Sequence, residues 1–188
     1  DGTFSLLRLP TLWRCSLYAK NNQTIVDATK PSNIEDQLQK IVPMDSSYEV
    51  IEIRPYKIHQ RILENYRVGR IVFAGDAAHI NSPSGGMGMN GGIHDIWNLT
   101  SKLASIINDN EDIALLDLYS KQRQPIAKEE IIKQAHQNRT RMQEKDKKKR
   151  RKELTRLQNI VDNPIELRKF LLRSSMIDGL KKSQGIKK

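Results

Sequence analysis

The sequence predicts an α/β fold, in which the end of a β-sheet is followed by a strand, a loop and several helices. Residues 3–9 and 12–19 are rich in apolar and aromatic side chains and flank a turn at Pro10-Thr11, which indicates two adjacent strands. Residues 70–74 form a short apolar run followed by a glycine, which is typical of a buried strand. Beyond residue 92, apolar residues recur at helical spacing.

Two further elements are predicted between these strands. A short helix over residues 32–41 would have Ser32 as its N-cap, with Glu35 three residues later completing a capping box. The alternation of side chains over residues 48–53 predicts a strand, and Pro55 would interrupt its ladder of hydrogen bonds.

Helices are expected through most of the remaining chain. The first is indicated by apolar residues that recur on one face and are expected in the core: Ile93, Ile96, Trp97, Leu99, Leu103, Ile106 and Ile107. A second helix is predicted over residues 112–123, and Pro125 is expected at the start of a third. Asp162 or Asn163 is expected to cap a last helix, with Pro164 in its first turn.

The composition, with 37% apolar and 29% charged residues, is that of a soluble globular protein. No run approaches the roughly 18 consecutive apolar residues that a transmembrane segment needs. The single cysteine, Cys15, cannot form an internal disulfide, which fits a reducing, cytoplasmic location. Because the chain opens at Asp1, without a methionine and within strand-like sequence, we expect it to be part of a longer polypeptide.

The net charge of +10 is concentrated at the C-terminal end. From Lys128 onward there are 19 Lys and Arg residues against 8 Asp and Glu residues, so the preceding part is almost neutral. The densest run, residues 145–152, is interpreted as a solvated helix face. Contact with nucleic acid or an anionic membrane is the alternative. The run lacks interleaved aromatic residues, and no nucleic-acid partner is expected.

A glycine-rich segment after the predicted strand carries the functional signal, because six of the ten glycines lie within residues 75–92. Asp76 follows the carboxyl end of the strand, where open α/β sheets bind ligands, and its carboxylate suits a sugar or ribitol hydroxyl. Pro83 fixes a turn of the loop. Three glycines remove Cβ atoms where a flat ligand would collide: Gly85, Gly86 and Gly88. A helix expected to begin near Asn90 would direct free N–H groups at the loop.

This segment resembles the second FAD motif of the flavoprotein aromatic hydroxylases, the para-hydroxybenzoate hydroxylase family. The elements of that motif stand in order and at the right spacing: Gly75, Asp76, Ala77, Ala78, His79, Pro83, Gly86, Gly88, Met89, Asn90, Gly92, Ile93, Asp95, Asn98 and Leu99. Residues 68–74 resemble the strand of the family that enters the motif. Tyr119 and the run 122–125 resemble the stretch that follows the long helix. The resemblance covers about residues 50–130.

The resemblance implies an FAD site formed by Gly75, Asp76, Pro83, Gly86, Gly88, Met89 and Asn90. Asp76 would bind the ribitol, the Pro83 loop would run beside the flavin ring, and the amides of Met89 and Asn90 would face the pyrimidine carbonyl. It also implies NAD(P)H as co-substrate, with oxygen transferred to an electron-rich ring of a small, aromatic substrate. Catalytic residues are not assigned, and no metal is expected.

Two parts of the family pattern are not recognisable: the first FAD motif, a strand followed by G-x-G-x-x-G, and an internal Asp-Gly motif. We therefore expect this chain by itself to hold FAD weakly and to be inactive. The alternatives are a non-hydroxylating FAD oxidoreductase of the same fold, or an inactive or split flavoprotein that acts as a binding module through its basic tail.

Several nearby residues receive structural interpretations. Residues 86–91 also match G-x-G-x-x-G, but the match begins too far after the strand for a nicotinamide-binding fingerprint. His79 is interpreted as packing or hydrogen bonding within the loop, and His94 as an ordinary helix residue. Asp95 is interpreted as complementing the helix dipole near the first turn.

Three segments with different roles are expected. Residues 1–65 would form the end of a substrate-binding sheet domain, and residues 66–127 the C-terminal part of an FAD-binding domain. Residues 128–188 would form a basic helical extension.

Overall fold

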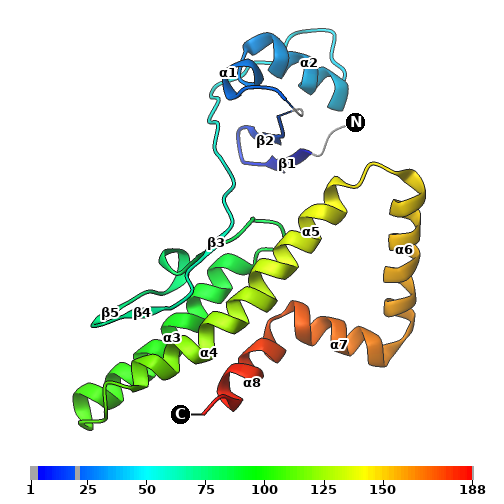
Figure 1. Ribbon diagram of the computed structural model, residues 1–188. Coiled ribbons are helices and arrows are strands. Elements are labelled where there is room, and N and C mark those ends of the chain that lie inside the picture. The colour runs from blue at the N-terminus through cyan, green and yellow to red at the C-terminus, as the bar shows by residue number, and fades with distance from the viewer. Residues whose placement is uncertain (1–3, 20–21, 188) are drawn as a thin grey trace. The chain divides into compact units, whose positions relative to one another are not determined.

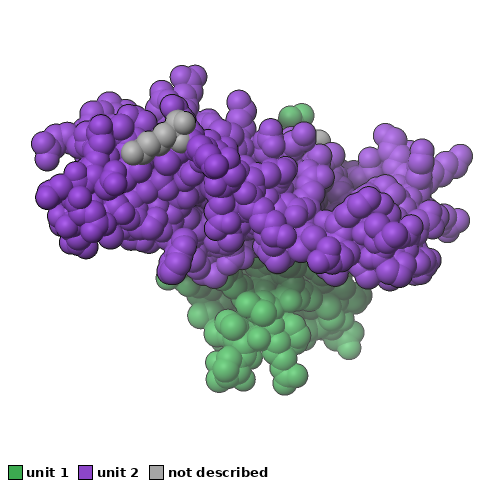
Figure 2. All heavy atoms as spheres, turned by 90° about the horizontal axis from the view of Figure 1, so that it is seen from below, with its two compact units in different colours: residues 1–57 green, residues 58–188 purple. Residues whose placement is uncertain are grey.

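The computed structural model describes residues 4–19 and 22–187 (Figure 1). The chain divides into two compact units, residues 1–57 and residues 58–188, shown in different colours in Figure 2. None of the helices in the described ranges is long and apolar enough to cross a membrane.

The first unit opens with an antiparallel pair of strands, β1 (Phe4–Arg8) and β2 (Trp13–Leu17), in which Phe4 lies opposite Leu17. The turn between them is closed by a hydrogen bond of 2.8 Å from the Leu9 N–H to the Leu12 carbonyl. The predicted strand pair is therefore confirmed.

Two helices follow, α1 (Ile25–Ala28) and α2 (Pro31–Ile41). The helix predicted over 32–41 is confirmed, but its predicted capping box is wrong. The N-cap is Lys30, which makes no side-chain cap bond, and Pro31 occupies the first turn, where its missing N–H costs nothing. The Glu35 carboxylate instead accepts hydrogen bonds from the Gln39 side chain and from the N–H of Tyr48.

The strand predicted over residues 48–53 does not form, and this segment has no regular secondary structure. Its first residue, Tyr48, is held against α2 by the bond to Glu35 and by a hydroxyl bond to the Val42 carbonyl. Within the described residues no other strand pairs with the segment, so its alternating side chains define no sheet face.

The second unit contains short antiparallel ladders: β3 (Arg61–Ile62) pairs with β6 (His79–Ile80), and β4 (Arg67–Val68) with β5 (Ile71–Val72). The strand predicted over residues 70–74 is therefore only two residues long. It is also less buried than predicted. Ile71 is 61% exposed, and the following residues, 72–74, are half-buried against the core.

Most of the second unit is helical, and Figure 1 shows α3 (Met87–Asn108) and α4 (Leu115–Ile126) running side by side. The helix α4 continues through a π-helical segment, η2 (Ala127–Ile132), into α5 (Lys133–Gln143). Three further helices complete the chain: α6 (Lys147–Asp162), α7 (Pro164–Ser174) and α8 (Ile177–Gly185).

Pro125 lies inside this continuous helix and does not begin a new one, contrary to the prediction. Proline removes one helical hydrogen bond and crowds the carbonyl four residues earlier. The hydrogen-bond pattern of the helix changes directly after the proline. The Ala127 N–H contacts the carbonyls of both Arg123 and Gln124, and residues 127–132 have the wider π-helical geometry. Burial of Ile126 and Ile131 on the continuing face stabilises the helix across this defect.

The core of the second unit lies where α3, α4 and η2 meet the loop of residues 72–79. Its buried members are Tyr66, Ala78, Met87, Leu99, Leu116, Tyr119, Ala127, Ile131, Ala135 and Met176. The expectation that the whole apolar face of α3 is core is only partly correct. Leu99, Leu103 and Ile106 pack into the core, whereas Trp97 is 75% exposed. Three other members of the predicted stripe are also exposed: Ile93, Ile96 and Ile107.

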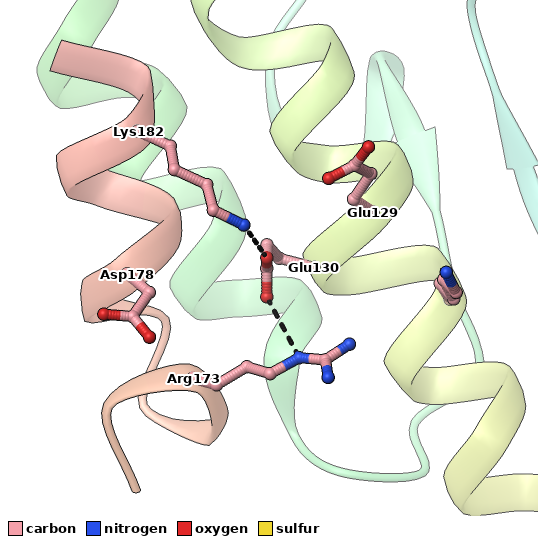
Figure 3. A pocket seen from close by; sticks show the side chains of 6 residues that line it. Glu129, Glu130, Arg173, Asp178 and Lys182 are labelled. Carbon is pink, nitrogen blue, oxygen red and sulfur yellow. Dashed lines mark hydrogen bonds and ion pairs between the residues drawn. The ribbon is translucent and has the colours of Figure 1, made fainter. Parts of the chain in front are cut away.

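The C-terminal helices are attached to this core by α8. Asn163, one of the two predicted caps, caps α7 by accepting hydrogen bonds from two backbone N–H groups, but α7 is not the last helix, contrary to the prediction, because α8 follows it. The nearly buried Glu130 of η2 lies 3.1 Å from the Lys182 amino group and 3.8 Å from Arg173 (Figure 3). Because Gly179 has no Cβ, α8 approaches closely; a Cβ there would lie 3.1 Å from the Glu130 side chain.

Two tyrosines in the core allow a prediction of how the free energy of unfolding changes at alkaline pH. Burial, together with the nearby Asp95 carboxylate, raises the pKa of both Tyr66 and Tyr119 above the ordinary phenol value. The folded state therefore keeps both protonated. Stability is unaffected below about pH 10, the unfolded pKa, and falls as pH rises above it because the unfolded chain releases these protons.

We expect Tyr66→Phe to weaken this alkaline loss of stability, measured as the free energy of urea unfolding between about pH 8 and pH 11. The buried Tyr66 hydroxyl has no hydrogen-bond partner among the residues that the structure describes, so this substitution removes a titrating group without breaking a bond seen there. The exposed Tyr56 provides the matched control, Tyr56→Phe. An alkaline dependence unchanged in Tyr66→Phe would contradict the prediction.

Candidate functional site

The glycine-rich segment forms a tight crossing between the end of β5 and the start of α3. Gly75 has a positive φ of 57° and opens a short 3-10 turn, η1 (Gly75–Ala77), which leads into β6. A Cβ added to Gly92 would lie 3.3 Å from the Cα of Gly75. The two backbones therefore pass so closely that a side chain at Gly92 would be crowded, and this contact places residues 75–80 against the first turns of α3.

The buried carboxylate of Asp95 also holds the loop of residues 75–80 in place. Asp95 accepts hydrogen bonds from the His79 ring at 2.7 Å, from the Gly75 N–H at 3.2 Å and from the Arg123 Nε at 2.8 Å. The three side chains are fully buried. One residue of α3 thus joins the loop to α4.

This geometry corrects the interpretation of two residues. Asp95 lies in the third turn of a helix that begins at Met87, too far from the terminus for a simple dipole role. His79 does form a hydrogen bond, as predicted, but its partner belongs to α3 and lies outside the loop. His94 is half-buried on α3, and burial lowers its pKa. No group of three or more metal-binding side chains occurs among the described residues.

Arg123 is the functional neighbour that the sequence analysis did not single out. It belonged to the run that resembles the family, but no role followed from that. A sequence signal was present, since Arg123 shares a helical face with Leu116, Tyr119 and Ile126, all of them buried. A charged residue on an otherwise apolar face indicates a buried charge partner. Its Nη1 and Nη2 atoms are buried without a partner in the described part of the chain.

The predicted cofactor-binding residues lie above this buried network, at the surface. Asp76 is exposed and forms no hydrogen bond with the residues that the structure describes. Pro83, Gly86, Met89 and Asn90 are exposed as well, and Gly88 is half-buried.

The start of α3 differs slightly from the prediction. The helix begins at Met87, three residues before Asn90, after Gly86 in a left-handed conformation. The Gly86 N–H is bonded to the Pro83 carbonyl at 3.1 Å. Asn90 is therefore the fourth helical residue, whose N–H bonds back to Gly86 in a regular helix, and the free N–H groups belong to residues 87–89.

A shallow apolar groove of about 430 Å³ runs along the exposed face of α3 beside this segment. It is lined by Ala74, Gly75, Met89, Gly92, Ile93, Ile96, Trp97 and Thr100. The groove brings together two of the predicted site residues, Gly75 and Met89. The remaining five lie outside its lining.

The buried network predicts a large cost for removing one charge. Asp95→Asn leaves the Arg123 guanidinium buried without a counter-charge, so we expect the free energy of unfolding to fall by about 3–5 kcal/mol. The control is Asp117→Asn, which breaks the ion pair between Arg67 and the 57% exposed Asp117 and should cost at most about 1 kcal/mol. Urea unfolding of the three proteins measures both effects, and equal losses in the two variants would contradict the prediction.

Comparison with known proteins agrees with the motif. Residues 6–135 match the family model described as an FAD binding domain. The chain is 34% identical over 113 residues to 6-hydroxy-3-succinoylpyridine 3-monooxygenase of Pseudomonas putida, covering 60% of this chain and 28% of that protein. It is 30% identical over 171 residues to para-nitrophenol 4-monooxygenase of Pseudomonas sp., covering 89% of this chain and 42% of that protein.

The fold of the chain is also similar to that of a solved monooxygenase. The crystal structure of p-nitrophenol 4-monooxygenase from Pseudomonas putida superposes with a TM-score of 0.72 at 26% identity, covering 89% of this chain and 43% of that one. The chain thus spans less than half the length of each of these relatives. It belongs to the FAD-binding family of the flavoprotein aromatic hydroxylases.

Proposed function

We propose that this chain supplies the flavin-facing part of the cofactor site in an FAD-dependent monooxygenase. The natural protein would use NAD(P)H and oxygen to hydroxylate an aromatic or similar small molecule. The observation that carries the proposal is the segment of residues 75–90, which has the family's motif, exposes Asp76 and is anchored on Asp95. The division proposed is residues 1–65 for the substrate-binding sheet, 66–127 for flavin binding and 128–188 for a helical extension.

The residues at this loop fit the flavin and ribitol portion of FAD in their donor and acceptor chemistry. Asp76 offers an exposed carboxylate that is not committed to an internal bond, which suits a ribitol hydroxyl. Open space surrounds Gly86, where a Cβ would meet no atom within 4 Å. The loop can therefore approach a flat ring without a steric clash.

The start of α3 supplies a region of positive potential. Residues 87–89 have free N–H groups, and no acidic residue in the first turn neutralises them. Such a terminus stabilises nearby negative charge by about 0.3–1 kcal/mol at the surface and by up to about 2 kcal/mol when partly buried. This suits the electron-rich edge of a reduced flavin, and we propose that Met89 and Asn90 lie at that edge.

When bound, FAD supplies the redox chemistry that activates oxygen. This chain's own residues bind and orient the cofactor. Asp95 fixes the positions of Gly75 and His79 on either side of Asp76, so the backbone that carries Asp76 is held relative to α3. The buried Arg123 compensates the charge of Asp95.

Replacement of Asp76 tests the cofactor site. In the natural polypeptide, Asp76→Asn removes a charged acceptor and should raise the Kd for FAD by about 10- to 100-fold, since a hydrogen bond to a charged group contributes about 1.5–3 kcal/mol. Titration of the apoprotein with FAD, followed by flavin fluorescence, measures the change. The exposed Asp109 at the end of α3 provides the matched control, Asp109→Asn. An unchanged Kd in Asp76→Asn would remove Asp76 from the site, and a natural polypeptide that binds no FAD would refute the proposed function.

The reaction type has its own test. We expect an aromatic substrate to accelerate NAD(P)H oxidation and to gain one oxygen atom for each NAD(P)H consumed. The loss of NAD(P)H absorbance measures the rate and the amount of cofactor consumed, and mass spectrometry of the product formed under isotopically labelled dioxygen measures the oxygen gained. A product without the label would instead indicate a non-hydroxylating FAD oxidoreductase.

A further inference from the structure

The helices α6 and α7 with the two residues before them, here named the basic arm (residues 145–174), are not explained by flavin binding. Neither α6 nor α7 has a buried residue in the structure. In Figure 1, α6 diverges from the end of α5, to which Glu153 is linked by a 3.9 Å ion pair with Arg141. The match to the FAD-binding family model ends at residue 135, before the basic arm begins.

Arg156 and Lys169 of the basic arm pair with Glu153 and Glu166, but the positive charge of residues 145–152 is largely not neutralised within the described chain. Residues 145–152 contain seven basic side chains. Among the residues that the structure describes, only one of the seven, Lys149, lies near a carboxylate, at 3.9 Å from Glu144. Asp146, the single acidic residue of the run, is used as the N-cap of α6 and accepts two backbone N–H bonds.

The basic residues at the start of α6 also lie where positive charge destabilises a helix. Basic residues fill the first turn of α6, with no acidic residue there, so they face the positive end of the helix dipole. A solvated linker helix would gain stability from the opposite arrangement. Apart from the Asp146 cap, this placement does not stabilise the helix, and it leaves the charges available to an external anionic partner.

Exposed aliphatic side chains lie on the same face. Leu154 and Val161 are 66% and 56% exposed and follow Lys147 and Arg151 at helical spacing. In α7, Ile165 is 69% exposed. Nucleic-acid surfaces combine basic residues with aromatic side chains that stack on bases. The basic run and α6 contain no aromatic residue, and the one aromatic residue in the sequence of the basic arm is Phe170 of α7. Basic and aliphatic residues on one helix suit the boundary of an anionic bilayer.

We propose that the basic arm binds reversibly to an anionic phospholipid surface. Lys147, Arg150 and Arg151 contact the lipid phosphates, while Leu154 and Val161 enter the boundary between headgroups and acyl chains. The partner is a lipid surface that α6 lies on, without crossing it. This inference does not depend on the proposed flavin chemistry.

Vesicle binding of the full chain tests this inference. The probes are vesicles of phosphatidylcholine alone and of phosphatidylcholine with one quarter phosphatidylglycerol. We expect co-sedimentation with the second only. It should be lost at about 1 M salt, where the Debye length falls to about 3 Å. The variant with Lys147, Lys148, Arg150 and Arg151 all changed to Gln should bind at least about 100-fold more weakly, because each basic residue contributes about 5-fold at such a surface.

Matched variants separate the basic arm from general charge and from nucleic-acid binding. Arg8, Lys40, Lys57 and Arg70 are exposed basic residues outside the basic arm, and changing all four to Gln should leave binding within about 3-fold of the native chain. Leu154→Ser with Val161→Ser should weaken vesicle binding at unchanged charge, and circular dichroism would check that helix content is retained.

Three results would overturn the inference. The first is no binding to anionic vesicles, and the second is equal binding by the basic-arm and control variants. The third is tighter binding to a DNA or RNA duplex that is insensitive to the changes at Leu154 and Val161.

Discussion

The second unit depends on one buried carboxylate, that of Asp95, which accepts hydrogen bonds from a loop N–H, a histidine ring and an arginine at the same time. A carboxylate in a dry core is stable only when its charge and its lone pairs are satisfied, and here Arg123 supplies the charge while Gly75 and His79 supply donors. Because these partners come from three different segments, the ionic requirement of one residue fixes the positions of β6, α3 and α4 relative to one another.

Backbone contacts around the Asp95 network also position the surface residues that are proposed to bind FAD. The glycine contact between residues 75 and 92 brings the loop against α3, and the network below prevents it from moving away. Asp76 and residues 87–89 are consequently presented outward from a rigid base. Sites of this kind bind well because ordering the loop adds little entropic cost when a ligand arrives.

The helix α4 contains a proline, yet the residues around this proline pack into the core. Pro125 would end an isolated helix, yet α4 continues into η2 and α5 because Ile126, Ala127 and Ile131 are buried on its inner face. The π-helical segment absorbs the missing hydrogen bond and also places Glu130 beneath α8, where Lys182 and Arg173 pair with it. The contact that attaches the C-terminal helices is therefore made from the π-helical segment that follows the proline.

Features that depend on local chemistry were predictable from the order of the amino acids. These are the strand pair at the start, the Asn163 cap before Pro164, the glycine-rich loop after a short strand, and the membership in an FAD-binding family that its motif indicated. The flavin-contacting roles of individual residues remain predictions. Only the tertiary structure decided the role of Asp95, whose partners lie 16 residues before it and 28 residues after it in the chain. It also decided which apolar side chains of α3 are core, burying Leu99 and exposing Trp97. Helical periodicity shows that residues share a face, but the neighbours that cover that face come from distant segments whose packing no local pattern encodes.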